Sequence, residues 1–379
     1  MRYYFIVGEP SGDLHASKVM KKIKKRDAHA KFRFWGGDKM CEAVGKECMV
    51  KHIRETSFMG FKDVFRNIGT IGKQLTLCKQ DIKSFAPDVV VLVDYAGFNL
   101  KIAKFAKKQG IKTFYYIAPK VWAWRENRVR LIKKYVDELF VIFPFEINYF
   151  KRKGINAHYF GNPIIDAINK GGYYDFNRND YFTEHKLDVN RPMVALVAGS
   201  RRGEIRDNLP FMVKVANRFP EFQFVITAVP WLSDELYKRY MIGSIGNISI
   251  VTDKTYQTIK SADAAIVTSG TATLETALLG TPEFVCYYTA PLTTFIAKML
   301  IKIRFASLVN IILGREAIRE LLNKDMTVDN AAYELTSIMK GGERHKHLMD
   351  DYRILNKMMG DGEVSGKVAE KMIELSKIK

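Results

Sequence analysis

Short runs of apolar, β-branched and aromatic residues recur along the chain, and most are followed by a small-residue loop and a segment with helical periodicity. Residues 88–93 read as a continuous apolar run, which is typical of a parallel strand covered on both faces. Strands that alternate with helices in this way predict a doubly wound α/β fold. The predicted strands are residues 2–7, 31–35, 88–93, 112–117, 137–142, 158–160, 193–197, 222–228, 248–251, 263–267 and 284–288.

This alternation is interrupted at residues 171–180, which are polar and rich in turn-forming residues. Such a stretch predicts a linker between two domains. We therefore expect an N-terminal domain over residues 1–172 and a C-terminal domain over residues 181–345. The helical segment 346–379 should pack back toward the N-terminal domain or against a partner subunit.

The 379-residue chain has an ordinary apolar content of 47% but a formal net charge of +19. This charge predicts a polyanionic partner, which could be nucleic acid, an anionic membrane surface or a phosphorylated substrate. No nucleic-acid module motif is present, which disfavours an RNA-binding role. The four cysteines have no metal-site or disulfide spacing and are typical of a reducing cytosol. Because no apolar stretch is long enough to span a membrane, we expect any membrane contact to be peripheral.

A tight loop at residues 268–271 joins the predicted strand 263–267 to a helical segment at 272–279. The free backbone N–H groups and the dipole of a helix start favour an anion such as a diphosphate. Glu275, about one turn into the helix, could accept hydrogen bonds from a ribose. The alternative is an ordinary turn in which Ser269 or Thr271 caps the helix.

Another small-residue loop, residues 198–204, follows the predicted strand at 193–197 and again opens a helix. Arg201 and Arg202 lie in this loop, where guanidinium groups could bind phosphate. A strand, loop and helix also begin the chain, where Ser11 and Asp13 follow Gly8. This opening matches neither a GxGxxG nor a Walker A motif, and helix capping is the alternative role for the two polar residues.

Asp94 follows the apolar run at 88–93, at the carboxyl end of a predicted central strand. Active sites of open α/β sheets lie outside those strand ends, so Asp94 is a candidate general base. The alternative is an aspartate that caps the following helix. The loop at 118–128, after the next predicted strand, combines Trp122 and Trp124 with several cations. Such a surface favours binding of an anion.

Two apolar segments carry basic residues, 57–72 and 291–303. The first could line a groove for acyl chains or lie in a membrane interface, and the second could form a membrane-facing surface. The alternatives are core packing beneath a loop for the first segment and a domain interface for the second.

A set of short motifs runs along most of the chain: Gly8-Glu9-x-Ser11-Gly12-Asp13, Met59-Gly60, Pro87-Asp88, Asp94-x-x-x-Phe98-Asn99, Pro119-x-Val121-Trp122-Ala123-Trp124-Arg125, Phe143-Pro144-Phe145-Glu146, Gly199-Ser200-Arg201-x-x-Glu204-Ile205, Ser269-Gly270-Thr271-Ala272-Thr273-Leu274-Glu275, Pro291-Leu292-Thr293, Ser307-Leu308-x-Asn310 and Gly314-Arg315-Glu316. In these motifs the chain resembles the lipid-A-disaccharide synthases, bacterial glycosyltransferases of the GT-B fold. Two departures stand out, because Gly97 and Asn162 occupy positions where the family usually has aspartate and histidine. The first departure leaves Asp94 as the only candidate base.

The resemblance implies two Rossmann-like domains with a cleft between them and an inverting, metal-independent transfer without a cofactor. The donor would be UDP-2,3-diacylglucosamine and the acceptor 2,3-diacylglucosamine 1-phosphate, at the cytoplasmic face of the inner membrane. A homo-oligomer is possible, and a UDP-N-acetylglucosamine 2-epimerase or an undecaprenyl-linked transferase is the rival enzyme class. The expected site comprises Asp94 as catalytic base; Gly199, Ser200, Arg201, Ser269, Gly270, Thr271, Ala272, Glu275, Asn310 and Glu316 for the UDP donor; and Ser11, Gly12, Asn99, Trp122 and Arg125 for the acceptor or donor sugar.

Overall fold

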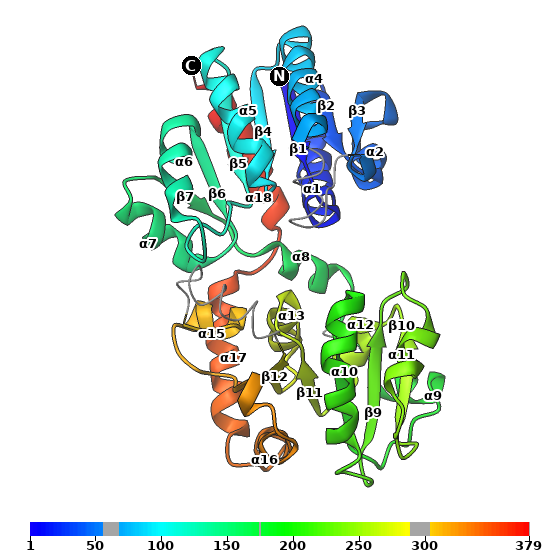
Figure 1. Cartoon of the computed structure of the whole chain (residues 1–379). Helices are drawn as coiled ribbons and strands as arrows, with labels where there is room; N and C mark the ends of the chain where they lie inside the picture. The colour runs from blue at the N-terminus through cyan, green and yellow to red at the C-terminus, as the bar shows by residue number, and fades with distance from the viewer. Residues whose placement is uncertain (56–67, 174–175, 289–303, 379) are drawn as a thin grey trace. The chain divides into compact units, whose positions relative to one another are not determined.

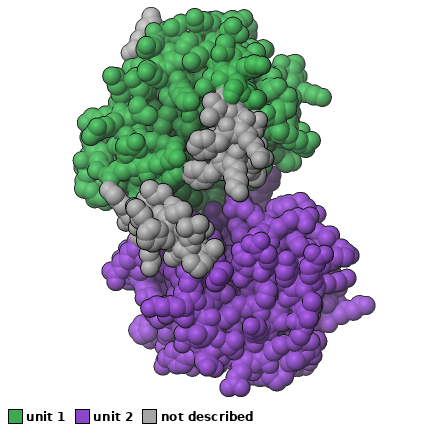
Figure 2. All heavy atoms as spheres, viewed as in Figure 1, with its two compact units in different colours: residues 1–166, 360–379 green, residues 167–359 purple. Residues whose placement is uncertain are grey.

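The structure is a computed structural model that describes residues 1–55, 68–173, 176–288 and 304–378. It divides into two compact units, Met1–Asp166 with Gly360–Lys379 (unit 1) and Ala167–Met359 (unit 2) (Figure 2). Residues 57–67 of the first predicted apolar segment and all of the second, residues 291–303, lie outside the described residues.

Unit 1 is built on a parallel sheet with the strand order β3-β2-β1-β4-β5-β6-β7 (Figure 1). Residue Tyr3 of β1 pairs with Phe32 on one side and with Val89 on the other, so β1 and β4 are central neighbours. The strands are β1 (Arg2–Val7), β2 (Lys31–Gly36), β3 (Met49–His52), β4 (Val89–Val93), β5 (Lys112–Tyr116), β6 (Glu138–Val141) and β7 (Ala157–Tyr159).

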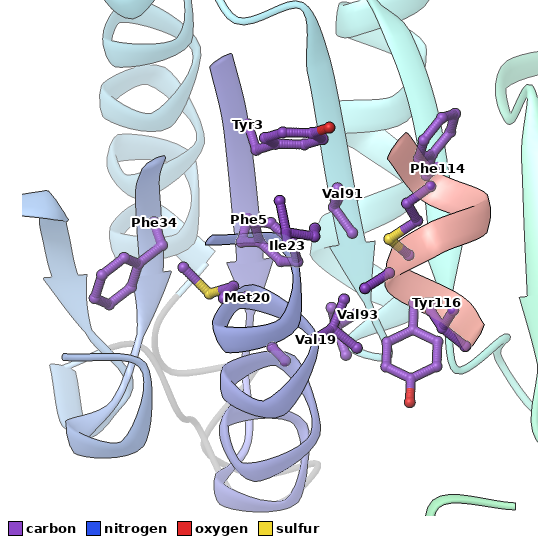
Figure 3. Packing of buried hydrophobic residues seen from close by; sticks show 14 of the residues in the cluster. Tyr3, Phe5, Val19, Met20, Ile23, Phe34, Val91, Val93, Phe114 and Tyr116 are labelled. Atoms are coloured by element: carbon purple, nitrogen blue, oxygen red, sulfur yellow. The ribbon is translucent and has the colours of Figure 1, made fainter. Parts of the chain in front are cut away.

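Helices cover both faces of this sheet, because successive strand side chains point to opposite faces. Tyr3 and Phe5 of β1 pack with α1, α2 and α18, whereas Tyr4 and Ile6 pack with α4, α5 and α6. Figure 3 shows the first of these cores. The helices of this unit are α1 (Pro10–Arg26), α2 (Asp38–Val44), α4 (Ile68–Phe85), α5 (Ala96–Lys108), α6 (Val129–Tyr135), α7 (Pro144–Arg152), α18 (Val364–Lys377) and the 3-10 turns η1 (Lys46–Cys48), η2 (Ile53–Glu55) and η3 (Glu126–Arg128).

Unit 2 repeats the arrangement with the parallel strand order β10-β9-β8-β11-β12-β13. Its strands are β8 (Met193–Val197), β9 (Gln223–Ala228), β10 (Ile248–Thr252), β11 (Ala264–Val267), β12 (Glu283–Tyr287) and β13 (Glu320–Leu322). Its helices are α9 (Arg178–Glu184), α10 (Arg202–Ala216), α11 (Asp234–Tyr240), α12 (Thr255–Ser261), α13 (Thr271–Leu279), α15 (Leu308–Leu313), α16 (Val328–Ile338), α17 (His345–Met359) and the 3-10 turn η4 (Asn323–Asp325).

The boundaries between the two units do not lie in the turn-rich segment 171–180. The first division falls inside α8 (Pro163–Lys170), and the second separates α17 from α18. The segment 346–379 is therefore not one group of helices. Helix α18 joins unit 1 because Val368 and Met372 complete the core formed by α1 and the sheet. The carboxylate of Asp166 fixes the start of α18 by accepting from the backbone N–H of Val364 at 2.9 Å and of Ser365 at 3.0 Å.

We predict that Met372→Ala destabilises unit 1, because Met372 is fully buried and its removal leaves a cavity between α18 and the sheet. The expected loss in the free energy of unfolding is about 2–5 kcal/mol. Lys371→Ala is the matched control, because Lys371 forms only a surface ion pair with Glu374 and should change stability by about 0.5 kcal/mol or less. Urea denaturation measures both variants, and equal effects would contradict the assignment of α18 to this core.

Candidate active site

The predicted site loops lie at the points where the direction of strand order reverses in each sheet. In unit 1 this switch lies between β1 and β4, and in unit 2 it lies between β8 and β11. The loop that carries Asp94 follows β4, and the loops at 198–201 and 268–271 follow β8 and β11. Ligands of open α/β sheets bind at such carboxyl-end switch points. Each unit therefore presents one candidate half-site.

Asp94 lies in a strained turn between β4 and α5. Asp94 and Tyr95 both have left-handed backbone conformations, with φ angles of 45° and 47°. The backbone carbonyl of Asp94 accepts hydrogen bonds from Asn99 Nδ2 at 2.8 Å and from the Tyr115 hydroxyl. Tyr95, not Asp94, is the residue that precedes α5, so Asp94 does not cap this helix. Backbone strain of this kind is typical of functional positions.

The side chain of Asp94 is half-buried, and its pKa is raised from the ordinary aspartate value. Burial is the main cause, and the negative charge of Glu9 adds to it, whereas the cation of Lys120 opposes the shift. A carboxylate with a raised pKa is a stronger proton acceptor than an exposed one and can act as a general base.

Asn99 supports this turn, and its place on the acceptor or donor-sugar side stays a prediction. It is fully buried, and its amide also donates to the carbonyl oxygens of Val93 at 3.2 Å and Ile6 at 3.4 Å. The side chain therefore joins the ends of β1 and β4 to the Asp94 turn.

The glycine loop after β1 is shaped by close packing. A Cβ atom on Gly8 would lie 2.2 Å from the Tyr95 ring, and one on Gly12 would lie 2.7 Å from Val7 Cγ1. Gly12 is thus buried against β1, whereas Ser11 is exposed in the first turn of α1, and the place of both on the acceptor or donor-sugar side stays a prediction. Asp13 caps α2 instead of its own helix, because its carboxylate accepts from the backbone N–H of Gly37 at 2.7 Å.

Trp122 is held in place by Glu146, a residue that was not among the predicted site residues. The indole N–H donates to Glu146 Oε1 at 2.9 Å, and the ring meets Phe145 edge-on with centroids 4.9 Å apart. Glu146 Oε2 also accepts from the backbone N–H of Phe143 at 3.0 Å. Burial raises the pKa of Glu146 to about 7, although the hydrogen bond from Trp122 opposes that shift. Glu146 belongs to the Phe143–Glu146 motif of the family, but the sequence alone does not show that its carboxylate binds Trp122.

Arg125 and Arg128 form a cationic surface around the exposed Trp124. Their guanidinium carbons lie 4.7 Å and 5.6 Å from the centre of the Trp124 ring. Burial lowers the pKa of Arg128, and the neighbouring charge of Arg125 lowers it further. An anion placed between these two stacked cations would offset their mutual repulsion.

In unit 2, the carboxylate of Glu204 fills the loop after β8. Its Oε2 accepts from the backbone N–H of Ser200 at 2.9 Å and of Arg201 at 3.2 Å. Gly199 makes room for this carboxylate with a φ of 110°. The two backbone N–H groups are therefore occupied by Glu204, and phosphate binding by the Arg201 and Arg202 side chains stays a prediction. The Arg201 side chain remains 79% exposed beside Arg202.

The start of α13 is open by comparison. Gly270 precedes the helix and no side chain caps it, so neither Ser269 nor Thr271 is the predicted N-cap. The Ser269 hydroxyl instead donates to the Ala306 carbonyl at 2.9 Å. A Cβ atom built on Gly270 would meet no described atom within 4 Å. The N–H groups of the first turn, which includes Ala272, thus keep the character of an anion site.

Glu275 lies one turn further along α13 and is half-buried. Its Oε1 accepts from the Tyr256 hydroxyl at 2.7 Å, and the Tyr256 ring meets Tyr173 edge-on. Burial raises the pKa of Glu275, and the hydrogen bond from Tyr256 opposes that shift. No hydrogen bond to the second oxygen, Oε2, is found within the described ranges, which leaves a carboxylate oxygen for a ribose hydroxyl.

The structure gives protein partners to Asn310 and Glu316, and their role toward the donor stays a prediction. Asn310 is fully buried, and its side chain donates to Ile318 O and accepts from the backbone N–H of Ala317, both at 2.8 Å. The Glu316 carboxylate accepts from Arg319 at 3.0 Å and lines a separate cavity of about 500 Å³. None of the residues that line this cavity belongs to the loops at 199–201 or 268–275.

The described residues include neither a metal-ion cluster nor a membrane-spanning helix. No cluster of three or more histidine, cysteine, aspartate or glutamate side chains could hold a metal ion in the described part of the chain. Within the same ranges, every helix is too short or too polar to cross a membrane.

Solved structures support the two-domain architecture. A UDP-GlcNAc 2-epimerase from Neisseria meningitidis, solved with bound UDP-GlcNAc, is similar with a TM-score of 0.64, 14% identity and coverage of 99% of this chain and 100% of that chain. The S. aureus MnaA–UDP co-structure gives a TM-score of 0.66 at 13% identity, covering 99% and 96% of the two chains. At such low identity the likeness shows the fold alone, and it confirms the predicted GT-B architecture.

Sequence comparison is more specific. The family model described as Lipid-A-disaccharide synthetase matches residues 3–371. A lipid-A-disaccharide synthase from Geobacter sulfurreducens is 32% identical over 378 residues, covering 99% of this chain and 97% of the relative. One from Coxiella burnetii is 32% identical over 369 residues, covering 96% of each. The chain belongs to the lipid-A-disaccharide synthase family of glycosyltransferases.

Proposed function

We propose that the chain transfers 2,3-diacylglucosamine from its UDP derivative to the 6-hydroxyl of 2,3-diacylglucosamine 1-phosphate. The anomeric carbon is inverted, and the products are the β-1,6-linked disaccharide phosphate and UDP. The observation that carries this proposal is family membership over nearly the whole chain, combined with a half-buried carboxylate at the switch point of unit 1. The similarity to 2-epimerases does not favour the rival class, because it extends only to the fold.

Asp94 is the proposed base. As the bond from the acceptor oxygen to the anomeric carbon forms and the bond to UDP breaks, the hydroxyl proton passes to the Asp94 carboxylate. The usual second aspartate of the family is replaced by Gly97, which is exposed and has no described neighbour within 4 Å of a built Cβ. A single base is sufficient for a single displacement.

The leaving diphosphate would bind at the open start of α13. Backbone N–H groups fixed in advance stabilise negative charge as it develops on the leaving oxygen. The exposed Arg201 side chain, whose guanidinium donates to Glu204 Oε1 at 3.0 Å, adds a cation, while Glu204 holds its loop in shape. Glu275 would accept a ribose hydroxyl through its second oxygen. This arrangement requires no metal ion to neutralise the diphosphate.

Trp122, Arg125 and the exposed Ser11 are the proposed contacts to the acceptor or donor sugar. Arg125 and Arg128, stacked on Trp124, suit the 1-phosphate of the acceptor, because that dianion would relieve their repulsion. Trp122, fixed by Glu146, offers a rigid ring face against which a sugar could lie.

Unit 1 also carries the surface proposed to meet an anionic membrane on its cytoplasmic side. Helices α5 and α6 expose a dense set of cations, and Leu131 lies among them with 41% of its surface exposed. Each cation near such a surface contributes about 1 kcal/mol to binding. The exposed basic residues are Lys101, Lys104, Lys107, Lys108, Arg130, Lys133 and Lys134.

The proposed reaction predicts a requirement for acylated substrates. In mixed detergent micelles, the protein should release UDP from UDP-2,3-diacylglucosamine when the acylated acceptor phosphate is present. Unacylated UDP-glucosamine should give a much smaller rate, because the acyl chains contribute binding energy. Product analysis by mass spectrometry measures both. Activity on the unacylated donor alone would reject this function in favour of a water-soluble substrate.

Asp94→Asn should keep UDP affinity and lose turnover. The amide preserves the size of the side chain but cannot take a proton, so kcat should fall by roughly 10²–10⁴-fold. Asp361→Asn is the control, because Asp361 is an exposed residue paired with Lys367. Steady-state rates and calorimetric UDP titration distinguish the two effects. Turnover that survives in Asp94→Asn would place the base elsewhere.

The pH dependence of kcat/KM should respond to the two charges near Asp94. The base acts as a carboxylate, so the rate falls as pH drops through its pKa. Glu9→Gln removes a charge that raises this pKa and should move the acid limb to lower pH. Lys120→Met removes a charge that lowers it and should move the limb to higher pH. Shifts in the same direction would show that Asp94 does not control the limb.

A further inference from the structure

Trp231 is an exposed tryptophan that is nevertheless fixed in position. It lies in the loop after β9, and 67% of its surface is exposed. Its indole N–H donates to the carbonyl oxygen of Ser200 at 3.1 Å. The ring is thereby tied to the loop after β8. An exposed indole with one edge hydrogen-bonded and a large accessible area has the form of a stacking platform.

The loop that carries Trp231 is held on both sides of the tryptophan. The backbone N–H of Val229 donates to the Tyr237 hydroxyl of α11 at 3.1 Å, and Leu232 is buried. A ring held in this way loses little conformational freedom when a ligand stacks on it.

The position of Trp231 follows from the strand order. Strands β10, β9, β8 and β11 are neighbours in that order, so the loops after them share one edge of the sheet. The proposed diphosphate site follows β11, and the proposed ribose contact, Glu275, is bonded to Tyr256 of α12, which follows β10. A nucleotide with its diphosphate at the start of α13 and its ribose at Glu275 directs its base away from β11, toward the ends of β9 and β10.

We propose that the uracil ring of the UDP donor stacks on the indole of Trp231. This inference rests on the proposed function, because it takes UDP as the ligand of unit 2. Uracil is a flat ring with two π faces, and stacking on an aromatic side chain is the usual way in which proteins bind such faces. The indole N–H is already used by Ser200, so Trp231 contributes area to the contact and no base-specific hydrogen bond.

Calorimetric titration of the full chain with UDP, UMP and inorganic diphosphate tests the proposal. Trp231→Ala should weaken UDP and UMP binding by roughly five- to hundredfold, the range for loss of one base–aromatic stack. The same variant should keep the wild-type affinity for inorganic diphosphate, measured by its competition with UDP. Trp231→Phe keeps a ring and should restore most of the affinity. Ile242→Ala, which removes another exposed apolar side chain of unit 2, is the control and should bind UDP as the wild type does.

The possible results separate this inference from the proposed function. Unchanged UDP affinity in Trp231→Ala, beside weakened affinity in Glu275→Ala, would overturn the stack and leave the donor site in place. An equal loss for UDP and inorganic diphosphate would also overturn it, because Trp231 would then only support the loop after β8. A wild-type protein that binds no UDP would overturn the proposed function and this inference together.

Discussion

The buried amide of Asn99 joins the ends of two central strands to the turn that presents Asp94. Two successive left-handed residues cost about 1–2 kcal/mol each, so the turn persists only because surrounding contacts stabilise it. The amide of Asn99 and the hydroxyl of Tyr115 bind the Asp94 carbonyl, while the absence of a side chain on Gly8 admits the Tyr95 ring. The same packing partly removes the Asp94 carboxylate from water and raises its pKa. Strain, burial and basicity therefore have one structural cause.

Unit 2 uses two helix starts in opposite ways. At α10 the carboxylate of Glu204 accepts from the backbone N–H groups of its own loop and also pairs with the exposed Arg201 side chain. At α13 no side chain of the described residues caps the helix, so within those ranges the N–H groups of the first turn stay open. A helix start that lacks an internal anion is suited to an external one. The two loops look alike in sequence because both are short, rich in small residues and followed by a helix.

The candidate site could be predicted only in part, because polar residues act in two roles that sequence does not separate. Asn99, Asn310 and Glu146 all belong to the motifs that carry the family resemblance, yet each is buried and hydrogen-bonded to protein groups. A motif constrains the type of residue at a position, whether that residue binds a ligand or supports one that does. Strand β13 was also missed, because Glu320–Leu322 is too short to give a pattern.

The sequence by itself determined the alternation of strands and helices, the doubly wound class and the family, because long apolar runs and well-separated motifs are local properties of the chain. It also located the loops after β4, β8 and β11 as candidate sites. Only the tertiary structure decided that α17 and α18 belong to different units, that Glu204 fills one loop while the start of α13 stays open, and that Trp231 is tied to Ser200. Each of these outcomes depends on which residues from distant parts of the chain meet, and burial and hydrogen bonding between them have no signature in local sequence.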